Sequence, residues 1–184
     1  YGGSERLRIS YDLGAIEEKD KKRTIQQWCT QLPTFRNVRW LSIWSHVTQP
    51  VFDAACQLPE LECLQIKWSN IKSLAQIARL QKLLYLYIGS STKIESVEPL
   101  ASLSSLRMLH IENFKLVTDF SPLLLLTSLQ SLNVTGSMWT RQNIGSLEPF
   151  SQMTWLEDLA LDTSKVSSIQ PLAALQNLKT LSVG

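Results

Sequence analysis

Hydrophobic residues recur along the chain in a six-residue pattern, with aliphatic side chains at its first, fourth and sixth positions. The pattern is clear at 106–111, where the sequence reads LRMLHI. Seven copies begin at Val38, Leu61, Leu83, Leu106, Leu129, Leu156 and Leu178. Successive copies are spaced by 23, 22, 23, 23, 27 and 22 residues. A fixed period in this range indicates a solenoid, in which each repeat packs only against its neighbours.

Each copy alternates apolar and polar residues, which predicts a short strand. After the strand, apolar residues recur at every third position, as in Ile94, Val97, Leu100 and Leu103. A period of 3.0 fits short 3₁₀ turns or extended segments. In four repeats a proline precedes the central apolar residue, and its fixed φ suits the first turn of a short helix; these are Pro99, Pro122, Pro149 and Pro171. Each repeat is therefore predicted to be a strand, a turn and a tight helical return.

The first 37 residues follow a different pattern. Alternation over residues 5–10 predicts a short strand. Within residues 16–32, the apolar side chains at 25, 28, 29 and 32 share one face of an amphipathic helix that Pro33 ends. We interpret residues 1–37 as an N-terminal cap or one atypical long repeat, followed by an array of about seven repeats over residues 38–184.

The repeats resemble leucine-rich repeats of the 22-residue class, seen in protein phosphatase 1 regulators and bacterial internalins. Residues 156–178, which include VSSIQPLAAL at 166–175, follow that pattern almost throughout. The resemblance implies an α/β solenoid: a right-handed horseshoe with a parallel β-sheet on its concave side and short 3₁₀ or helical segments on its convex side.

Two departures from the family's pattern carry expectations. The asparagine that links successive turns is replaced, and the replacements are Ser69, Ser91, Phe114, Ser137 and Ser164. Serine can still donate a hydrogen bond to the backbone carbonyl of a neighbouring turn, whereas phenylalanine cannot, so we expect a less regular turn at Phe114. The repeat from Leu129 to Leu156 is longer, and its extra residues at 137–143 predict a loop on the rim.

Composition excludes some classes of partner. The 184 residues carry a net charge of +2 with both signs interspersed, which disfavours nucleic acid. No apolar run reaches the roughly 18 residues of a membrane span, so membrane insertion is not expected. The three cysteines form no disulfide-like pattern and indicate a reducing, cytoplasmic location. Because the first residue is Tyr1 rather than Met, secretion or surface display after removal of a signal is the alternative.

Little in the sequence suggests catalysis. The two histidines, His46 and His110, lie in no metal-binding or nucleophile motif, so neither an enzyme activity nor a cofactor is expected. His110 is close in sequence to Glu112, which we expect to raise its pKa. We interpret His110 as a structural side chain on the surface of the sheet.

Binding has stronger support, because alternation on each strand directs every second side chain toward the concave surface. Aromatic and sulfur-bearing residues gather there in the first four repeats. The candidate partner-binding residues are Trp40, Trp44, Trp68, Tyr85, Tyr87, Met108 and His110 on the sheet, with Trp139 and Arg141 on the rim loop. Trp and Tyr are common in binding hot spots. In the alternative interpretation, the rings pack on one another or under the N-terminal helix through Trp28.

The sequence thus predicts a non-catalytic module that binds another protein, whose identity it does not specify. One alternative is a substrate-recognition fragment of a larger multidomain enzyme or effector. Another is a self-assembling structural protein whose open solenoid ends stack, because the chain stops at Gly184 directly after a predicted strand.

Overall fold

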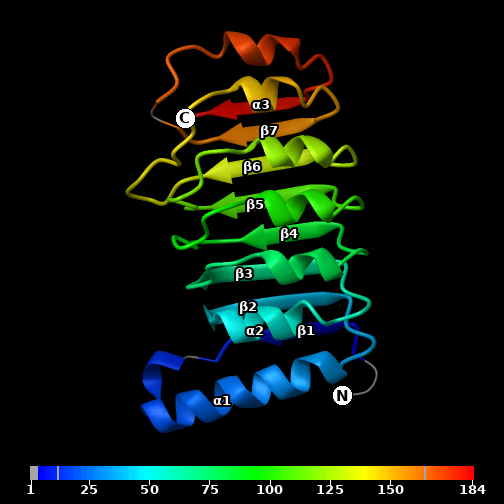
Figure 1. Cartoon of the computed structure of the whole chain (residues 1–184), viewed down its shortest axis with the longest axis vertical. Helices are drawn as coiled ribbons and strands as arrows, with labels where there is room; N and C mark the ends of the chain where they lie inside the picture. Colours follow the sequence, from blue (N-terminus) through cyan, green and yellow to red (C-terminus); the bar gives the residue numbers. More distant parts are fainter. Residues whose placement is uncertain (1–3, 12, 164) are drawn as a thin grey trace.

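The computed structural model describes residues 4–11, 13–163 and 165–184, and shows one stack of repeats (Figure 1). Eight strands form a single sheet in sequence order, and each pair of neighbours is parallel. The strands are β1 (Arg6–Ile9), β2 (Trp40–Val47), β3 (Cys63–Ser69), β4 (Tyr85–Ile88), β5 (Met108–Glu112), β6 (Ser131–Thr135), β7 (Asp158–Leu161) and β8 (Thr180–Val183). The predicted α/β solenoid is confirmed.

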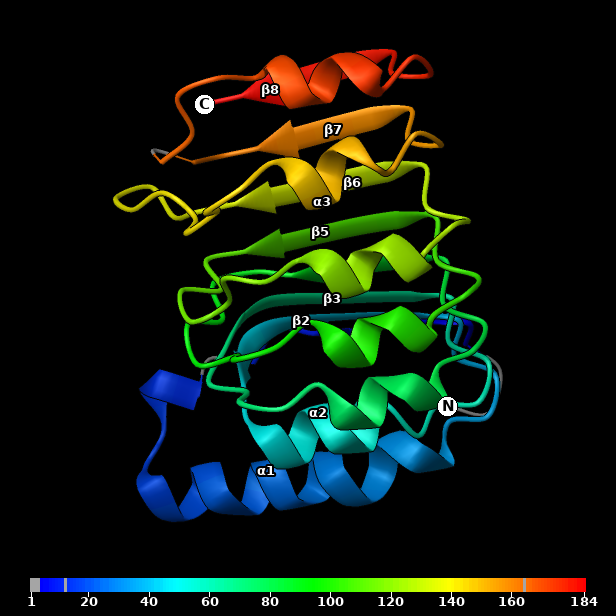
Figure 2. The same cartoon turned by 45° about the horizontal axis from the view of Figure 1, so that its top comes forward.

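Short helices return the chain along one face of the sheet (Figure 2). They are η1 (Leu13–Ala15), α1 (Glu18–Gln31), η2 (Leu32–Thr34), α2 (Gln49–Ala55), η3 (Ala75–Arg79), η4 (Glu98–Ser102), η5 (Ser121–Leu125), α3 (Glu148–Ser151) and η6 (Gln170–Ala174). The four prolines predicted to start helical returns lie in the first turns of η4, η5, α3 and η6. The sequence pattern did not predict α2, where buried Val51, Phe52, Ala54 and Ala55 follow helical rather than three-residue spacing.

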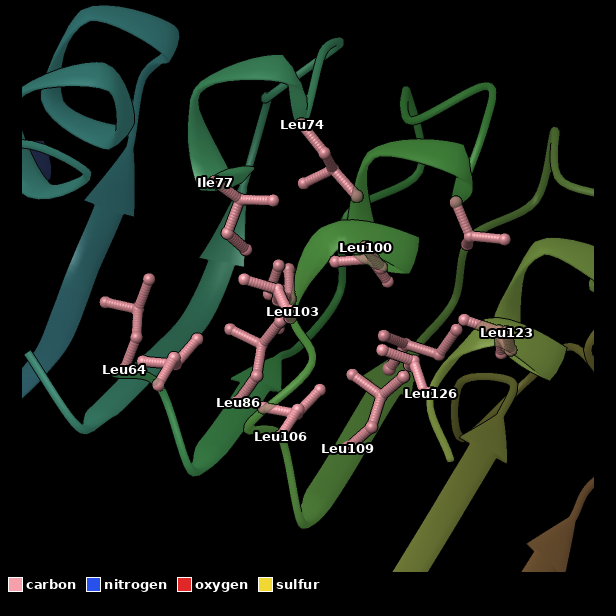
Figure 3. Packing of buried hydrophobic residues seen from close by; sticks show 14 of the residues in the cluster. Leu64, Leu74, Ile77, Leu86, Leu100, Leu103, Leu106, Leu109, Leu123 and Leu126 are labelled. Atoms are coloured by element: carbon pink, nitrogen blue, oxygen red, sulfur yellow. The ribbon is translucent and has the colours of Figure 1, made fainter. Parts of the chain in front are cut away.

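The core is a set of leucine rows that run along the solenoid. The fourth residue of each repeat pattern lies in register with its neighbours, as for Leu64, Leu86 and Leu109. Figure 3 shows these side chains meeting leucines of the returns, such as Leu100 and Leu103. At about 1.5–3 kcal/mol for each fully buried aliphatic side chain, the rows stabilise repeats that could not fold alone.

The N-terminal segment continues the sheet. β1 pairs with β2 so that Arg6 lies beside Trp40 and Leu7 beside Leu41. The helix predicted over 16–32 is α1, which packs beside α2 at one end of the stack (Figure 2). Its Trp28 is half-buried and lines a hollow with Leu7 and Ile9 on the helical side of β1. The ring of Trp28 therefore packs behind the sheet, and the division of the chain at residue 38 stays a prediction.

Ser69 and Ser91 stand where the family has its linking asparagine, but they link two turns through their hydroxyl groups and not through a neighbouring backbone carbonyl. The hydroxyl oxygens of Ser69 and Ser91 lie 2.6 Å apart, and Ser91 also donates to the carbonyl of Gly89 at 2.7 Å. In the repeat that begins at Leu156, Thr163 donates to the carbonyl of Ile144 at 3.2 Å. Ser164, the residue expected there, lies outside the described residues.

The turn at Phe114 is closed by a side chain from the next repeat. Buried Gln142 accepts a hydrogen bond from the Phe114 amide at 3.0 Å and donates one to the Phe114 carbonyl at 2.8 Å. Asn113, just before, has a φ of 62°, in the left-handed region. The linking role expected for Ser137 is wrong, since its hydroxyl instead accepts from the amides of Trp139 and Thr140.

Candidate protein-interaction face

The face of the sheet opposite the helices, here called the open face, is formed by alternate strand side chains. The register aligns them in columns, because Trp40, Cys63, Tyr85 and Met108 lie beside one another on successive strands. A second column contains Ser42, Gln65, Tyr87 and His110. We call Trp40, Trp44, Tyr85, Tyr87, Met108 and His110 the aromatic patch.

Trp40 and Tyr85 stack over Cys63. Their ring centroids are 6.4 Å apart and the ring planes differ by 18°. Cys63 lies between them in the register and is buried, which raises the pKa of its thiol to about 12. The Trp40 indole N–H donates to Ser42 Oγ at 3.1 Å, and Ser42 donates to Gln65 Oε1 at 2.7 Å. The rings thus pack on one another, as the alternative interpretation held, and Trp40 is still exposed.

Tyr87 crosses the face toward β5. Its hydroxyl donates to Glu112 Oε2 at 3.0 Å, and its ring lies 4.7 Å from that of His110. Gly89 makes room for it, because a Cβ there would lie 2.5 Å from the Tyr87 hydroxyl oxygen. Burial and the Glu112 carboxylate raise the pKa of Tyr87 to about 12, so the phenol is protonated at neutral pH.

The expectation for the pKa of His110 is wrong in sign. Burial lowers that pKa below its ordinary value, because the cation is poorly solvated under the Tyr87 ring. Glu112 accepts the Tyr87 hydroxyl instead. The imidazole is neutral at pH 7, with Nε2 3.4 Å from Thr135 Oγ1.

Trp44 lies where β2 departs from regular pairing. The register shifts between Ile43 and His46, which leaves Trp44 43% exposed while Ser45 turns inward and donates to the Tyr11 carbonyl. A hollow of about 280 Å³ lies beside the indole. Its lining includes Trp44, Gln65, Lys67, Tyr85, Tyr87 and His110. Four of the predicted binding residues, Trp44, Tyr85, Tyr87 and His110, therefore line one hollow, and Trp40 and Met108 lie at its edge.

The tryptophans are accompanied by cations that were not among the predicted binding residues. The guanidinium of Arg8 lies 4.9 Å from the Trp44 ring centroid, and Lys67 Nζ lies 5.1 Å from it. Arg6 lies 5.3 Å from the Trp40 ring. The signal was present: alternation over residues 5–10 puts Arg6 and Arg8 on one face of a strand, and matching Leu7 and Ile9 to the repeat pattern would have aligned β1 with β2.

The remaining predicted residues lie apart from the patch. Trp68 is half-buried near the end of β3, paired in register with His46, and its ring is 5.3 Å from Lys67 Nζ. Trp139 is on the predicted rim loop, which protrudes beyond the C-terminal end of β6 (Figures 1 and 2). Arg141 forms an ion pair with Asp162.

The rim loop is a hydrogen-bonded turn with an exposed apolar tip. The Ser137 amide donates to the Thr140 carbonyl at 2.7 Å, and Asp162 Oδ2 accepts from the Gly136 amide at 3.2 Å. Met138 and Trp139 at the tip are 90% and 87% exposed. The loop is thus held at its base while two large apolar side chains face solvent.

Neither a metal site nor a membrane-spanning helix is found in the described segments. Across residues 4–11, 13–163 and 165–184, no three His, Cys, Asp or Glu side chains come together as a metal ion would require. None of the helices described is long and apolar enough to cross a lipid bilayer.

Comparison with known proteins identifies the fold. No protein-family model matches the chain, and no curated protein matches it. Among solved structures, a leucine-rich-repeat protein of Leptospira interrogans matches with a TM-score of 0.66 and 19% identity, over 84% of this chain and 39% of that one. Internalin C2 of Listeria monocytogenes matches with a TM-score of 0.53 and 23% identity, over 83% and 74%.

A third match is the leucine-rich-repeat ectodomain of the Arabidopsis thaliana receptor kinase GASSHO1/SCHENGEN3, solved in complex with CASPARIAN STRIP INTEGRITY FACTOR 2. It has a TM-score of 0.56 and 19% identity, over 84% of this chain and 20% of that one. The chain spans 61% of another Listeria internalin, InlF. The matches to the Leptospira protein, internalin C2 and the Arabidopsis ectodomain show that the chain has the leucine-rich-repeat fold, with repeats that resemble those of internalins.

Proposed function

We propose that the chain is a non-catalytic module that binds another protein through the aromatic patch on its open face. The observation that supports this most directly is the exposure of Trp44 and Trp40 beside Tyr85, Tyr87 and Met108. Contiguous exposed aromatic groups mark interaction sites, and Trp and Tyr supply much of the binding energy in protein interfaces.

The patch is also preorganised. Trp40 stacks on Tyr85, Tyr87 is hydrogen-bonded to Glu112, and Trp44 is flanked by two cations. Side chains held in this way lose little rotamer freedom when a partner binds, so more of the contact energy contributes to affinity. The Arabidopsis ectodomain, solved with CASPARIAN STRIP INTEGRITY FACTOR 2, supports the proposal by analogy of fold.

Affinity capture from native extract with mass spectrometry tests the proposal. We expect one protein to be retained in proportion to the wild-type chain and lost with Trp44→Ala and with Tyr87→Ala. Ile169→Ala is the control, because Ile169 is exposed but precedes η6 on the helical side. Circular dichroism verifies that all variants fold. If both patch variants retain the same protein as the wild type, the aromatic patch is not the site.

The rim loop is a proposed second contact. Its exposed Trp139 is available, whereas Arg141 already pairs with Asp162. In the same capture, Trp139→Ala is expected to weaken retention less than Trp44→Ala does. If retention of the partner depends on Trp139 and not on Trp44 or Tyr87, the binding site is on the rim loop and not on the sheet.

A second candidate function, self-association, is favoured by the last strand. Leu181 on β8 is 43% exposed, whereas its counterparts Leu109 and Leu159 are 1% exposed. Among the described residues, β8 pairs with β7 alone, and an edge strand with exposed apolar side chains is prone to pair with another chain. Sedimentation velocity over a range of protein concentrations tests self-association. A protein that is monomeric at every concentration would contradict it.

Two further expectations stay proposals. We place the protein in a reducing compartment such as the cytoplasm, on the grounds that Cys29, Cys56 and Cys63 are free thiols. The third hypothesis, a recognition segment of a larger enzyme or effector, is compatible with a chain that spans 39% and 20% of two solved neighbours. Capture of the same partner by a longer native protein would support it.

A further inference from the structure

Three cations lie together at one end of the open face, and each lies over a tryptophan ring. Arg6 is 5.3 Å from the Trp40 centroid, and Arg8 and Lys67 are 4.9 and 5.1 Å from the Trp44 centroid. All three side chains are exposed. None of them forms an ion pair with a carboxylate of the described residues, whereas nearby Arg39 pairs with Glu62.

An aromatic ring positions a cation without neutralising it. The ring quadrupole attracts the charge, but the N–H groups still lack an acceptor. A guanidinium held in this way presents a planar pair of donors that matches a carboxylate, and an ammonium adds a second positive charge. Arg8 lies on β1 and Lys67 lies on β3, the two strands that flank β2, which carries Trp44. The two cations therefore form a preorganised anion-binding site on both sides of the Trp44 ring.

We infer that the partner presents an extended acidic segment, with carboxylate side chains over Arg8 and Lys67. This inference rests on the proposed function, and it adds the chemistry of the partner. The adjoining hollow of about 280 Å³ takes one neighbouring side chain of that segment. Its volume is just below the roughly 300–1,000 Å³ of small-molecule pockets, which favours a side chain over a whole ligand.

The charges of the open face also set a direction for the segment. Acidic groups lie farther along the face, where Glu112 on β5 accepts from Tyr87 and Asp162, after β7, pairs with Arg141. Asp158 on β7 is half-exposed and forms no ion pair with the described cations. From β2 to β7 is five strand spacings, about 24 Å, which about seven extended residues span. A basic residue about seven positions from the acidic ones would reach Asp158.

Selection of random peptides of about 12 residues, displayed on phage, tests the inference with the full chain immobilised. The test variant is Arg8→Glu/Lys67→Glu. The matched control is Lys72→Glu/Lys115→Glu, which changes the same number of charges at exposed positions after β3 and β5. We expect the wild type and the control to enrich peptides rich in Asp and Glu, and the test variant to lose that enrichment.

The best acidic peptide, synthesised and titrated, is expected to bind the test variant about tenfold or more weakly than the control, with affinity that falls as salt rises. If neutral or basic peptides are enriched and still require Trp44, the acidic-segment inference is wrong while the proposed function stands. If no peptide is enriched on the wild type, an extended acidic segment is not the ligand. Equal affinity for test and control variants also overturns it.

Discussion

At Gly89 the absence of a side chain determines where the Tyr87 ring lies. A Cβ at this position would be 2.3 Å from the Lys67 carbonyl oxygen and 2.5 Å from the Tyr87 hydroxyl oxygen. The phenol is able to move, but the carbonyl belongs to the neighbouring strand and is fixed by the sheet. The chemistry of the patch thus depends on a residue that contributes no atom to its surface.

Gly89→Ala is expected to lower the free energy of unfolding by about 1–3 kcal/mol, because the new methyl group overpacks the strand. It is also expected to displace Tyr87 from Glu112 and weaken partner binding. Urea denaturation measures the first effect. Gly145→Ala is the control, since a Cβ at Gly145 meets nothing within 4 Å. Equal stability of the two variants would show that the Lys67 carbonyl moves aside freely.

The histidines make stability depend on pH. Burial lowers the pKa of His110, and burial with the charges of Lys21 and Lys93 lowers that of His46, both from 6.5. Just below pH 6.5 the unfolded chain therefore binds more protons than the folded one, so the free energy of unfolding falls as pH decreases through this window.

Urea unfolding at about pH 7.5 and about pH 5.5, above the range in which most carboxylates titrate, measures that loss. The loss is expected to be smaller in His110→Gln and smallest in His46→Gln/His110→Gln. A double variant that loses as much stability as the wild type would contradict the assigned pKa directions.

At the scale of elements, each turn between strand and return needs a polar group to satisfy its backbone. Ser69 accepts from the Ile71 amide and Ser91 donates to the Gly89 carbonyl in two turns, and Gln142 reaches back from the rim loop to bond the Phe114 amide and carbonyl. The longer repeat thus has a structural role besides exposing Trp139, because its base closes the turn of the preceding repeat.

Gln142→Ala is expected to lower the free energy of unfolding by about 2–4 kcal/mol, since it leaves the buried amide and carbonyl of Phe114 without partners. Gln152→Ala is the matched control, an exposed glutamine whose loss is expected to cost under about 0.5 kcal/mol. Chemical denaturation measures both. A cost near that of the control would mean that water satisfies the Phe114 backbone.

Elements that follow the repeat pattern could be predicted from the sequence, whereas contacts made by the irregular segments could not. Strand register followed from the leucine pattern, because a slip of one residue would expose every apolar side chain. The aromatic patch followed from alternation on those strands. The contact of Arg8 with Trp44 and that of Gln142 with Phe114 could not be predicted in this way. They join residues 36 and 28 positions apart, across segments that lack the repeat pattern. Such contacts depend on the geometry of a long first repeat and of an insertion.

For the whole molecule, the cost of losing a core leucine depends on its place in the stack, because each repeat is covered only by its neighbours. Leu109→Ala in a central strand is expected to cost about 2–5 kcal/mol. Leu181→Ala on the exposed last strand is expected to cost under about 1 kcal/mol. Urea unfolding of the two variants measures the difference. Similar costs would indicate that a second copy covers β8 in solution.

The regular stacking of repeats also fixes the distance between the two proposed contact surfaces. The aromatic patch ends at β5 and the rim loop follows β6, so the number of repeats between them sets their separation. A second copy of residues 90–112, inserted in register after Glu112, would add one strand that repeats Met108, His110 and Glu112, and would move Trp139 away from Tyr87 by one strand spacing, about 4.8 Å. A partner that contacts both surfaces would then lose one contact and bind more weakly, whereas a partner that contacts the patch alone would bind with unchanged affinity.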